Sequence, residues 1–178
     1  MLRRVLDALY VASAGFASLC LFGIFAMMVS QAGLRGFGIQ LVGADDLTAY
    51  LCVAAAFFAL AHTFRRGELI RVSVLLGMLK PGARRAMEGV ALLLAAIVVG
   101  YMVWYTFADV LFSYEIDDVA QGTIAFKLWV PKLAMPIGAG VLLISILDEA
   151  VRVLRDEKPN YMLEAEARAA AQDYSAEI

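Results

Sequence analysis

Few side chains in this sequence have the type and spacing that catalysis, metal binding or redox chemistry requires. The chain contains a single histidine, His62, and two cysteines, Cys20 and Cys52, which are far apart and form no C-x-x-C motif. A haem held between helices commonly takes a pair of histidine ligands, and thiol-disulfide enzymes use paired cysteines. No H-E-x-x-H motif or similar cluster of His and carboxylates indicates a metal site. We therefore expect no enzyme activity and no cofactor, and a serine activated by His62 stays open only as an alternative.

The chain contains four long runs with almost no charge, and the elements that they form must position any functional side chains. The runs cover about 8–34, 47–64, 89–108 and 128–147, and Lys132 is the single charged residue inside them. Each run is close to the roughly 20 residues that cross about 30 Å of hydrocarbon as a helix. The sequence is also 62% apolar with a mean hydropathy of +0.77. It predicts an all-α integral membrane protein with four transmembrane helices.

Lys and Arg are distributed unevenly between the two sides of these runs. Arg35 alone lies between the first and second run, and Lys127 is the only basic residue between the third and the fourth. The basic residues on the other side include Arg3, Arg4, Arg65, Arg66, Arg71, Lys80, Arg84, Arg85, Arg152 and Arg155. Because cytoplasmic loops are enriched in Lys and Arg, we expect both termini and the middle loop to be cytoplasmic. No basic footprint for nucleic acid is present beyond that loop.

The middle loop contains an apolar segment, 68–80, that is too short to span a membrane. It is apolar around most of a helical circumference, so we predict a short cytoplasmic interfacial helix with one side in lipid and the other against protein. Pro81 and Gly82 then end this segment, and a new helix starts near Ala83 and continues into the third span. Leu75 and Leu76 are the candidate docking residues of the segment.

The chain is predicted to form one membrane domain over 1–158, followed by a polar cytoplasmic tail. In this tail, 159–178, Ala alternates with acidic and amide residues, and nothing apolar recurs at helical spacing. We expect the tail to be frayed or disordered.

Aromatic residues gather near the predicted outer end of the third span and at the start of the fourth. They are Tyr101, Trp104, Tyr105, Phe107, Phe112, Tyr114 and Trp129. Such rings commonly settle at headgroup level, and we interpret them as an interfacial belt and not as a ligand cage.

A small proton-coupled exporter is the main alternative, since such exporters are also short four-helix chains. They depend on an acidic residue inside a span, where loss of hydration makes it a proton carrier. Every carboxylate here falls at the end of a predicted span or in a loop, and Asp109 comes closest. We interpret Asp109 as a solvated residue at the headgroup boundary.

The order of several motifs resembles one family of transport proteins. The run from Arg65 to Val72, RRGELIRV, follows the second span and is similar to the signature of the small DctQ-type membrane subunits of tripartite ATP-independent periplasmic (TRAP) transporters. The resemblance extends over roughly Leu2 to Arg155. It includes Arg35-Gly36-Phe37-Gly38 after the first span, the Asp45-Asp46-Leu47 run that opens the second, and Trp129, Pro131, Pro136 and Gly138 in the fourth. The family usually has His where Leu69 stands and often Asp where Ser73 stands.

The resemblance implies a small, non-catalytic permease subunit in the bacterial inner membrane. Its expected partners are a large multispanning TRAP subunit, a periplasmic substrate-binding protein and phospholipid, and the expected activity is sodium-coupled uptake of an organic acid. The residues expected at a subunit or lipid interface are Arg65, Arg66, Gly67, Glu68, Arg71, Leu75, Leu76, Trp129, Pro131, Pro136 and Gly138. Asp45 and Asp46 are the expected contacts on the periplasmic side.

Overall fold

The computed structural model describes residues 2–39, 41–66, 81–120 and 125–155. Its helices are α1 (Leu2–Gly36), α2 (Ala44–Arg66), α4 (Pro81–Glu115), α5 (Trp129–Lys132) and α6 (Ala134–Leu154). Four segments are long and apolar enough to cross a membrane: Leu6–Gly36, Ala44–Arg66, Ala86–Glu115 and Trp129–Leu154, the last of which joins α5 and α6. The predicted all-α fold with four spans is confirmed. The predicted interfacial helix over 68–80 and the tail 159–178 lie outside the described residues.

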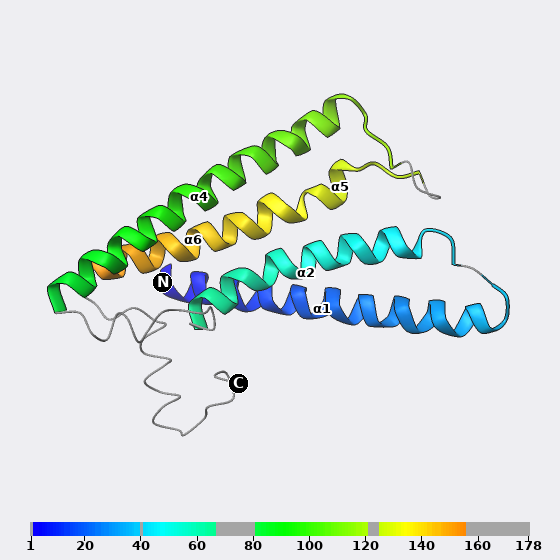
Figure 1. The fold of residues 1–178 in the computed structure, drawn as a ribbon, viewed down its shortest axis with the longest axis horizontal. Coiled ribbons are helices and arrows are strands. Elements are labelled where there is room, and N and C mark those ends of the chain that lie inside the picture. Colours follow the sequence, from blue (N-terminus) through cyan, green and yellow to red (C-terminus); the bar gives the residue numbers. More distant parts are fainter. Residues whose placement is uncertain (1, 40, 67–80, 121–124, 156–178) are drawn as a thin grey trace, which may run out of the picture.

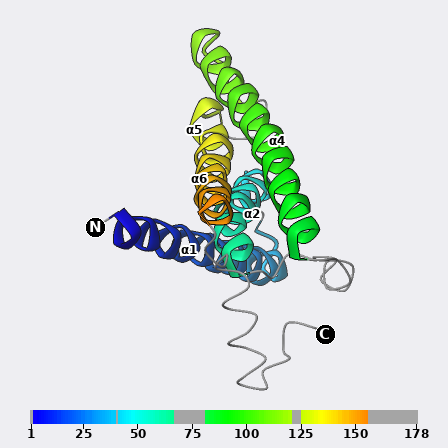
Figure 2. The same ribbon diagram turned by 90° about the vertical axis from the view of Figure 1, so that its left-hand side faces the viewer.

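The four spans lie side by side in a row in the order α1, α2, α6, α4 (Figure 1). Most contacts join neighbours in this row, and α1 touches α6 only slightly. Successive spans run in opposite directions, so the start of α1, the end of α2, the start of α4 and the end of α6 share one end of the molecule, here named the terminal end. The connections α1–α2 and α4–α5 share the other, the turn end. Seen from the terminal end, the row is twisted, and α1 and α4 run in clearly different directions (Figure 2).

The pair α1–α2 is close because small side chains line its contact. Ala17 and Cys20 on α1 are buried against a face of α2 that carries Ala54 and Ala55. Across the same contact, the Ser13 hydroxyl donates a hydrogen bond of 2.6 Å to the Phe58 carbonyl oxygen. In lipid, helices usually associate through small residues and interhelical hydrogen bonds. The lipid tails are as apolar as the side chains, so the hydrophobic effect does not drive the helices together.

The contact between α2 and α6 is closest at Gly138. A Cβ atom placed on Gly138 would lie 2.7 Å from Phe57 Cβ and 2.8 Å from the Phe57 carbonyl carbon. No side chain fits between the helices at this point, so glycine is required there. Gly15, Gly100 and Gly140 have nothing within 4 Å of such an atom, and their presence reflects the general tolerance of membrane helices for glycine.

Local sequence explains where the helices begin and end. After α1, Gly38 adopts φ +74°, and the N–H groups of Ile39 and Gly38 bond to the carbonyls of Leu34 and Arg35 at 3.0 and 3.1 Å. These bonds form a Schellman motif, which needs a left-handed residue that glycine supplies best. α4, which carries the third span, begins at Pro81, two residues before the predicted helix start at Ala83, because proline is accepted in the first turn of a helix, where its missing N–H is not needed.

The fourth span is interrupted near its start. α5 ends at Lys132 and α6 begins at Ala134. Pro136 lies in the first turn of α6 and has no N–H to offer the Lys132 carbonyl, so the hydrogen-bond ladder cannot continue evenly from α5. The resulting change of direction lets α5 follow the connection that returns from α4 (Figure 1).

Candidate subunit interface

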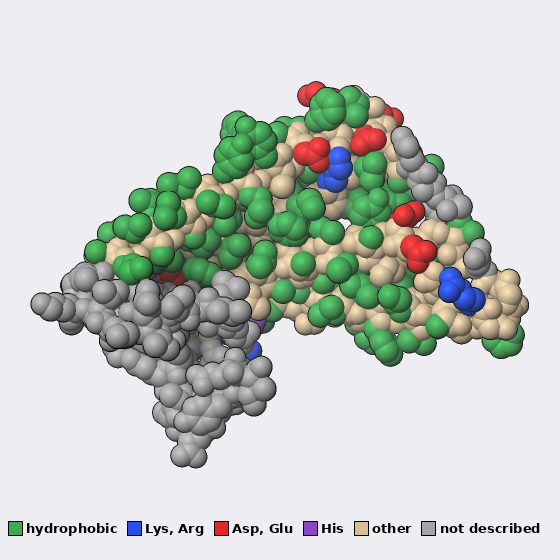
Figure 3. Space-filling view, in the orientation of Figure 1, with side chains coloured by type: hydrophobic (Ala, Val, Ile, Leu, Met, Phe, Trp, Pro, Cys, Tyr) green, Lys and Arg blue, Asp and Glu red, His purple; other side chains and the backbone are tan. Residues whose placement is uncertain are grey.

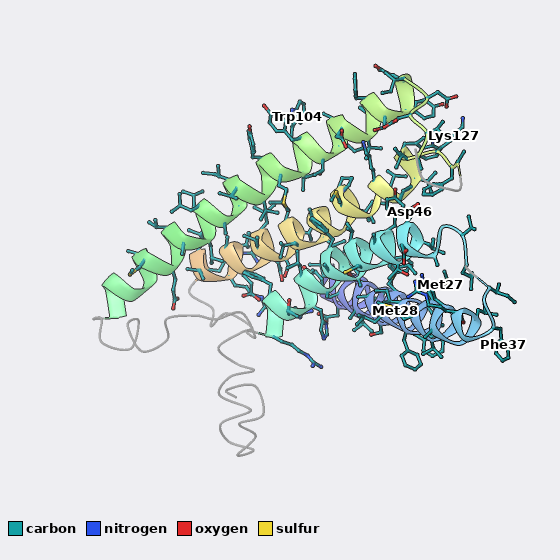
Figure 4. The ribbon with its side chains drawn as sticks, turned by 45° about the vertical axis from the view of Figure 1, so that its right-hand side comes forward. Met27, Met28, Phe37, Asp46, Trp104 and Lys127 are labelled. Carbon is teal, nitrogen blue, oxygen red and sulfur yellow. The ribbon has the colours of Figure 1, made fainter. Side chains whose placement is uncertain are left out.

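The outward face of α4 is a broad apolar surface with many exposed aromatic and aliphatic side chains. α4 packs mainly on α6, at one edge of the row, and most of its circumference has no neighbour in the described chain. Trp104 is 74% exposed and projects away from the row (Figure 4), and apolar side chains cover α4 in the space-filling view (Figure 3). Tyr101 and Tyr105 stack against each other with ring centroids 4.3 Å apart.

The aromatic stripe on α4 extends deeper than a headgroup layer requires. Tyr101 and Phe112 are both exposed and lie on the same side of the helix, and eleven residues separate them by about 16 Å along the axis. An interfacial belt needs only the outer part of that length, whereas aromatic residues are also enriched where proteins contact each other. The stripe therefore has the composition of an interface as well as that of a belt.

A polar network at the turn end fixes the outer half of α4 to the start of the fourth span. The Lys132 ammonium group donates to the Ser113 hydroxyl at 2.6 Å and lies 3.0 Å from an Asp109 carboxylate oxygen. Asp118 is slightly farther, at 3.9 Å. Asp109 is thus an ion-pair partner as well as a partly exposed residue. A lone lysine in an apolar run needs such a partner, and that rule could have pointed to Asp109 from the sequence.

Backbone contacts join the described residues on either side of 121–124 in the connection between α4 and α5. Val119 and Lys127 form an isolated antiparallel bridge, next to a 2.9 Å bond from the Ala120 N–H to the Phe126 carbonyl. An edge-to-face contact, with centroids 5.3 Å apart, joins Phe126 to Tyr50 on α2. Through this ring contact, the connection between α4 and α5 also packs against the second span.

Side-chain contacts hold the base of this connection. Asp117 has a positive φ of 51°, and its carboxylate forms an ion pair with the Lys127 ammonium group at 2.9 Å. The hydrogen bond to Asp117, assisted by its charge, raises the pKa of the exposed Lys127 above its usual value. Trp129 packs edge-to-face on Tyr114 with centroids 5.7 Å apart. These contacts give the turn end a defined shape.

At the terminal end, Arg65 is engaged within the chain. Its guanidinium group lies 2.5 Å from the Asp7 carboxylate and 5.0 Å from the centre of the Tyr10 ring, so it connects α2 to α1. Arg66 is exposed and also has an interaction partner. Arg65 therefore has less freedom than a surface arginine to bind a headgroup or a partner.

Sequence reasoning missed the buried polar residues at the terminal end of α6. The predicted fourth span ended at Leu147, but α6 continues to Leu154 and buries Glu149, which is 1% exposed. Arg152 is also buried, and its Nε lies 3.8 Å from the Asp148 carboxylate. The Asp148–Arg152 spacing of four residues was the signal in the sequence for a helix that continues past Leu147. Glu149 also has an interaction partner.

The Tyr10 hydroxyl belongs to the same buried region. The Tyr10 side chain is almost completely buried and approaches Ser145 on α6, but its hydroxyl forms no well-aligned hydrogen bond within the described residues. Around it, apolar residues from all four spans, among them Leu92 and Ile146, form the main core. The polar groups thus lie where α1, α2 and α6 meet the core.

The structure does not gather the sequence-predicted interface residues into one site. Trp129 and Pro131 lie at the turn end, and Arg65 lies at the terminal end of α2. Pro136 and Gly138 are buried inside the row, so their surface is used within the chain. Asp45 and Asp46 lie in the first turn of α2 at the turn end. The positive end of the helix dipole stabilises carboxylates at this position. The remaining predicted residues, Gly67, Glu68, Arg71, Leu75 and Leu76, lie outside the described chain.

The described residues bring together no group of three or more His, Cys, Asp or Glu side chains that could hold a metal ion. Cys20 and Cys52 are both free. The described residues show helix packing and ion pairs at the two ends of the spans.

Comparison with known proteins gives one family. The family model for tripartite ATP-independent periplasmic transporters, DctQ component, matches residues 21–156, which include the C-terminal part of α1 and all later helices. No curated protein matches the chain. Because the model covers well over half of the sequence, and because the four apolar spans agree with a multi-pass inner-membrane protein, this chain belongs to the DctQ family, the small permease components of TRAP transporters.

Proposed function

We propose that this chain is a non-catalytic subunit that supports the scaffold of the large TRAP membrane subunit during sodium-coupled, binding-protein-dependent uptake of an organic acid. The observation that carries the proposal is the open row of spans in a member of this family. Within the described residues, a row only one helix thick encloses no interior that a solute could cross, yet it offers two broad faces to a neighbour. A supporting subunit needs such packing surface.

We infer that the outward face of α4 is the main contact with the large subunit. Its aromatic stripe, from Tyr101 to Phe112, is about 16 Å long and exposed, and most of the circumference of α4 has no neighbour in the described chain. Large aromatic residues dominate the binding energy of protein interfaces. The segment around Leu75 and Leu76 is a second proposed contact, on the cytoplasmic side, and Asp45 and Asp46 are proposed contacts on the periplasmic side.

A matched pair of substitutions tests the α4 contact. Trp104→Ala should reduce recovery of the large subunit when the complex is purified in detergent, because truncation removes an anchor from the interface. Phe22 on the outer face of α1 is 67% exposed and serves as the control, since Phe22→Ala removes a ring of similar exposure from the opposite edge of the row. Equal recovery of the large subunit with both variants would contradict a contact through the outward face of α4.

The orientation of the chain is also a proposal. The excess of Lys and Arg at the terminal end favours a cytoplasmic location for that end and a periplasmic location for the turn end. A reporter that is active only in the periplasm should work when it is fused near Val42 or Gln121 and should fail near Arg84 or Lys158. The reverse pattern would invert the topology.

Reconstitution tests the division of labour. The isolated chain in proteoliposomes should accumulate no organic acid under a sodium gradient, and uptake should start only when the large subunit and a loaded periplasmic protein are added. The exporter alternative gains one observation from the structure, the buried Glu149, because a buried carboxylate can act as a proton carrier. Glu149 lies in the last two turns of α6 and not at mid-span, which favours a structural role. Transport by the isolated chain that Glu149→Gln abolishes would support the exporter instead.

A further inference from the structure

A small cavity lies at the turn end between the last turn of α1 and the first turn of α2. Its volume is about 240 Å³, and it is open on one side. The residues that line it are Gln31, Arg35, Ile39, Leu41, Val42, Gly43 and Asp45. Pockets for drug-sized ligands usually measure about 300–1,000 Å³, so this cavity suits a smaller polar group.

The cavity holds two opposite charges that do not neutralise each other. The Arg35 guanidinium forms no ion pair with any described residue, and the Asp45 carboxylate, which lines the same cavity, is not within ion-pair distance of it. Gln31 Nε2 donates a 3.0 Å hydrogen bond to Asp45 Oδ1 and so holds the carboxylate in position. Basic and acidic side chains lie close together on this part of the surface (Figure 3). A ligand with a negative and a positive group would complement this arrangement.

The residues of the turn favour a position of the cavity at the edge of the apolar layer. Phe37 at the tip is 84% exposed and points away from the helices (Figure 4), and Ile39 and Val42 are also exposed. A turn that entered water would leave these apolar side chains hydrated. They are stable instead at the boundary between acyl chains and headgroups, where apolar bodies and charged tips are accommodated together.

We propose that this cavity binds the zwitterionic headgroup of a phosphatidylethanolamine-type lipid. The phosphate takes the Arg35 guanidinium, whose planar fork matches phosphate oxygens. The primary ammonium group takes the Asp45 carboxylate, and the glycerol and upper acyl carbons contact Ile39 and Val42. An anionic phosphatidylglycerol-type headgroup offers the same phosphate but no cation for Asp45, so it binds less well. Because headgroups are present in both leaflets, the site does not depend on the orientation of the chain.

The test is a competition between two lipids on the full-length chain. The protein is placed in nanodiscs made from equal amounts of phosphatidylethanolamine and phosphatidylglycerol with identical acyl chains, is extracted in mild detergent, and the retained lipids are measured by mass spectrometry. The wild-type chain should retain phosphatidylethanolamine in about two- to fivefold excess, as expected for one further exposed charge contact. Arg35→Gln should lower retention of both lipids, whereas Asp45→Asn should abolish only the preference.

Two controls make the outcome decisive. Asp45→Glu keeps the carboxylate and should keep the preference, which separates loss of the charge from damage to the first turn of α2. Asp117→Asn and Lys127→Gln remove the charges of another exposed ion pair at the same end and should leave the lipid ratio unchanged. The proposal is overturned if wild type shows no preference, if Asp45→Asn retains it, or if the Asp117 and Lys127 variants lose it as well.

Discussion

Gly138→Ala is the substitution whose effect follows most directly from the geometry. The new Cβ atom would lie 2.7, 2.8 and 2.9 Å from the Cβ, carbonyl carbon and carbonyl oxygen of Phe57. Carbon atoms in good contact are about 3.5–4.0 Å apart, so the helices must separate locally by about 1 Å. Two of the three atoms belong to the backbone of α2, so no change of rotamer relieves the overlap.

The size of the effect can be isolated with Gly140→Ala on the same helix. Gly140 has nothing within 4 Å of its added Cβ. Both substitutions gain the same helix propensity, up to about 1 kcal/mol, so this term cancels in the comparison. The remaining difference is the cost of overpacking, about 1–3 kcal/mol, which corresponds to about a 5- to 150-fold change in the unfolding equilibrium constant.

The measurement is unfolding of the purified chain as SDS is titrated into mild-detergent micelles, followed by circular dichroism. Gly138→Ala should unfold at clearly lower SDS than Gly140→Ala, and Gly140→Ala should match or exceed wild type. Equal transitions for the two variants would refute the close contact between α2 and α6. If Gly138→Ala lost binding of the large subunit without losing stability, Gly138 would instead be assigned to the interface with the large subunit.

Three further substitutions have definite expectations. Lys132→Met should lower the free energy of unfolding by about 1 kcal/mol, because three partly exposed polar groups lose the cation that they contact. Lys127→Met should have no measurable effect in the same SDS titration. Equal effects of the two substitutions would mean that the Lys132 network contributes nothing specific to stability. Arg65→Gln should cost about 1–2 kcal/mol through its ion pair and its contact with the Tyr10 ring, and unchanged stability would leave the arginine free for lipid or partner. Leu75→Asp should reduce recovery of the large subunit while membrane levels stay normal, and normal recovery would confine that segment to anchoring the loop.

The fold was predictable because its signals are long and redundant. An uncharged run of about 20 residues predicts a span regardless of its detailed packing, so the number of spans is confirmed. Helix ends depend on fewer residues. The helix α4 begins at Pro81 because proline is tolerated in a first turn, and α6 passes Leu147 because Asp148 and Arg152 pair on the helix.

The placement of the site residues was less predictable, because it depends on contacts between distant segments. Gly138 was selected as an interface residue, but the sequence does not reveal that it faces Phe57. Arg65 was weighed between lipid and partner, and its pairing with Asp7 requires knowledge of which helices are adjacent. The interfacial segment 68–80 lies outside the described residues and stays a prediction.

The row arrangement also affects how the stability of this subunit should be understood. Its three main helix contacts act in series, as in a short array of repeats, so weakening the central one between α2 and α6 leaves two intact helical hairpins that can part from each other. A large partner that lies along one face of the row contacts both hairpins and acts as a splint across that central contact. The apparent stability of the chain then depends on how much partner is present, and a variant that is unstable alone can be fully folded in the complex.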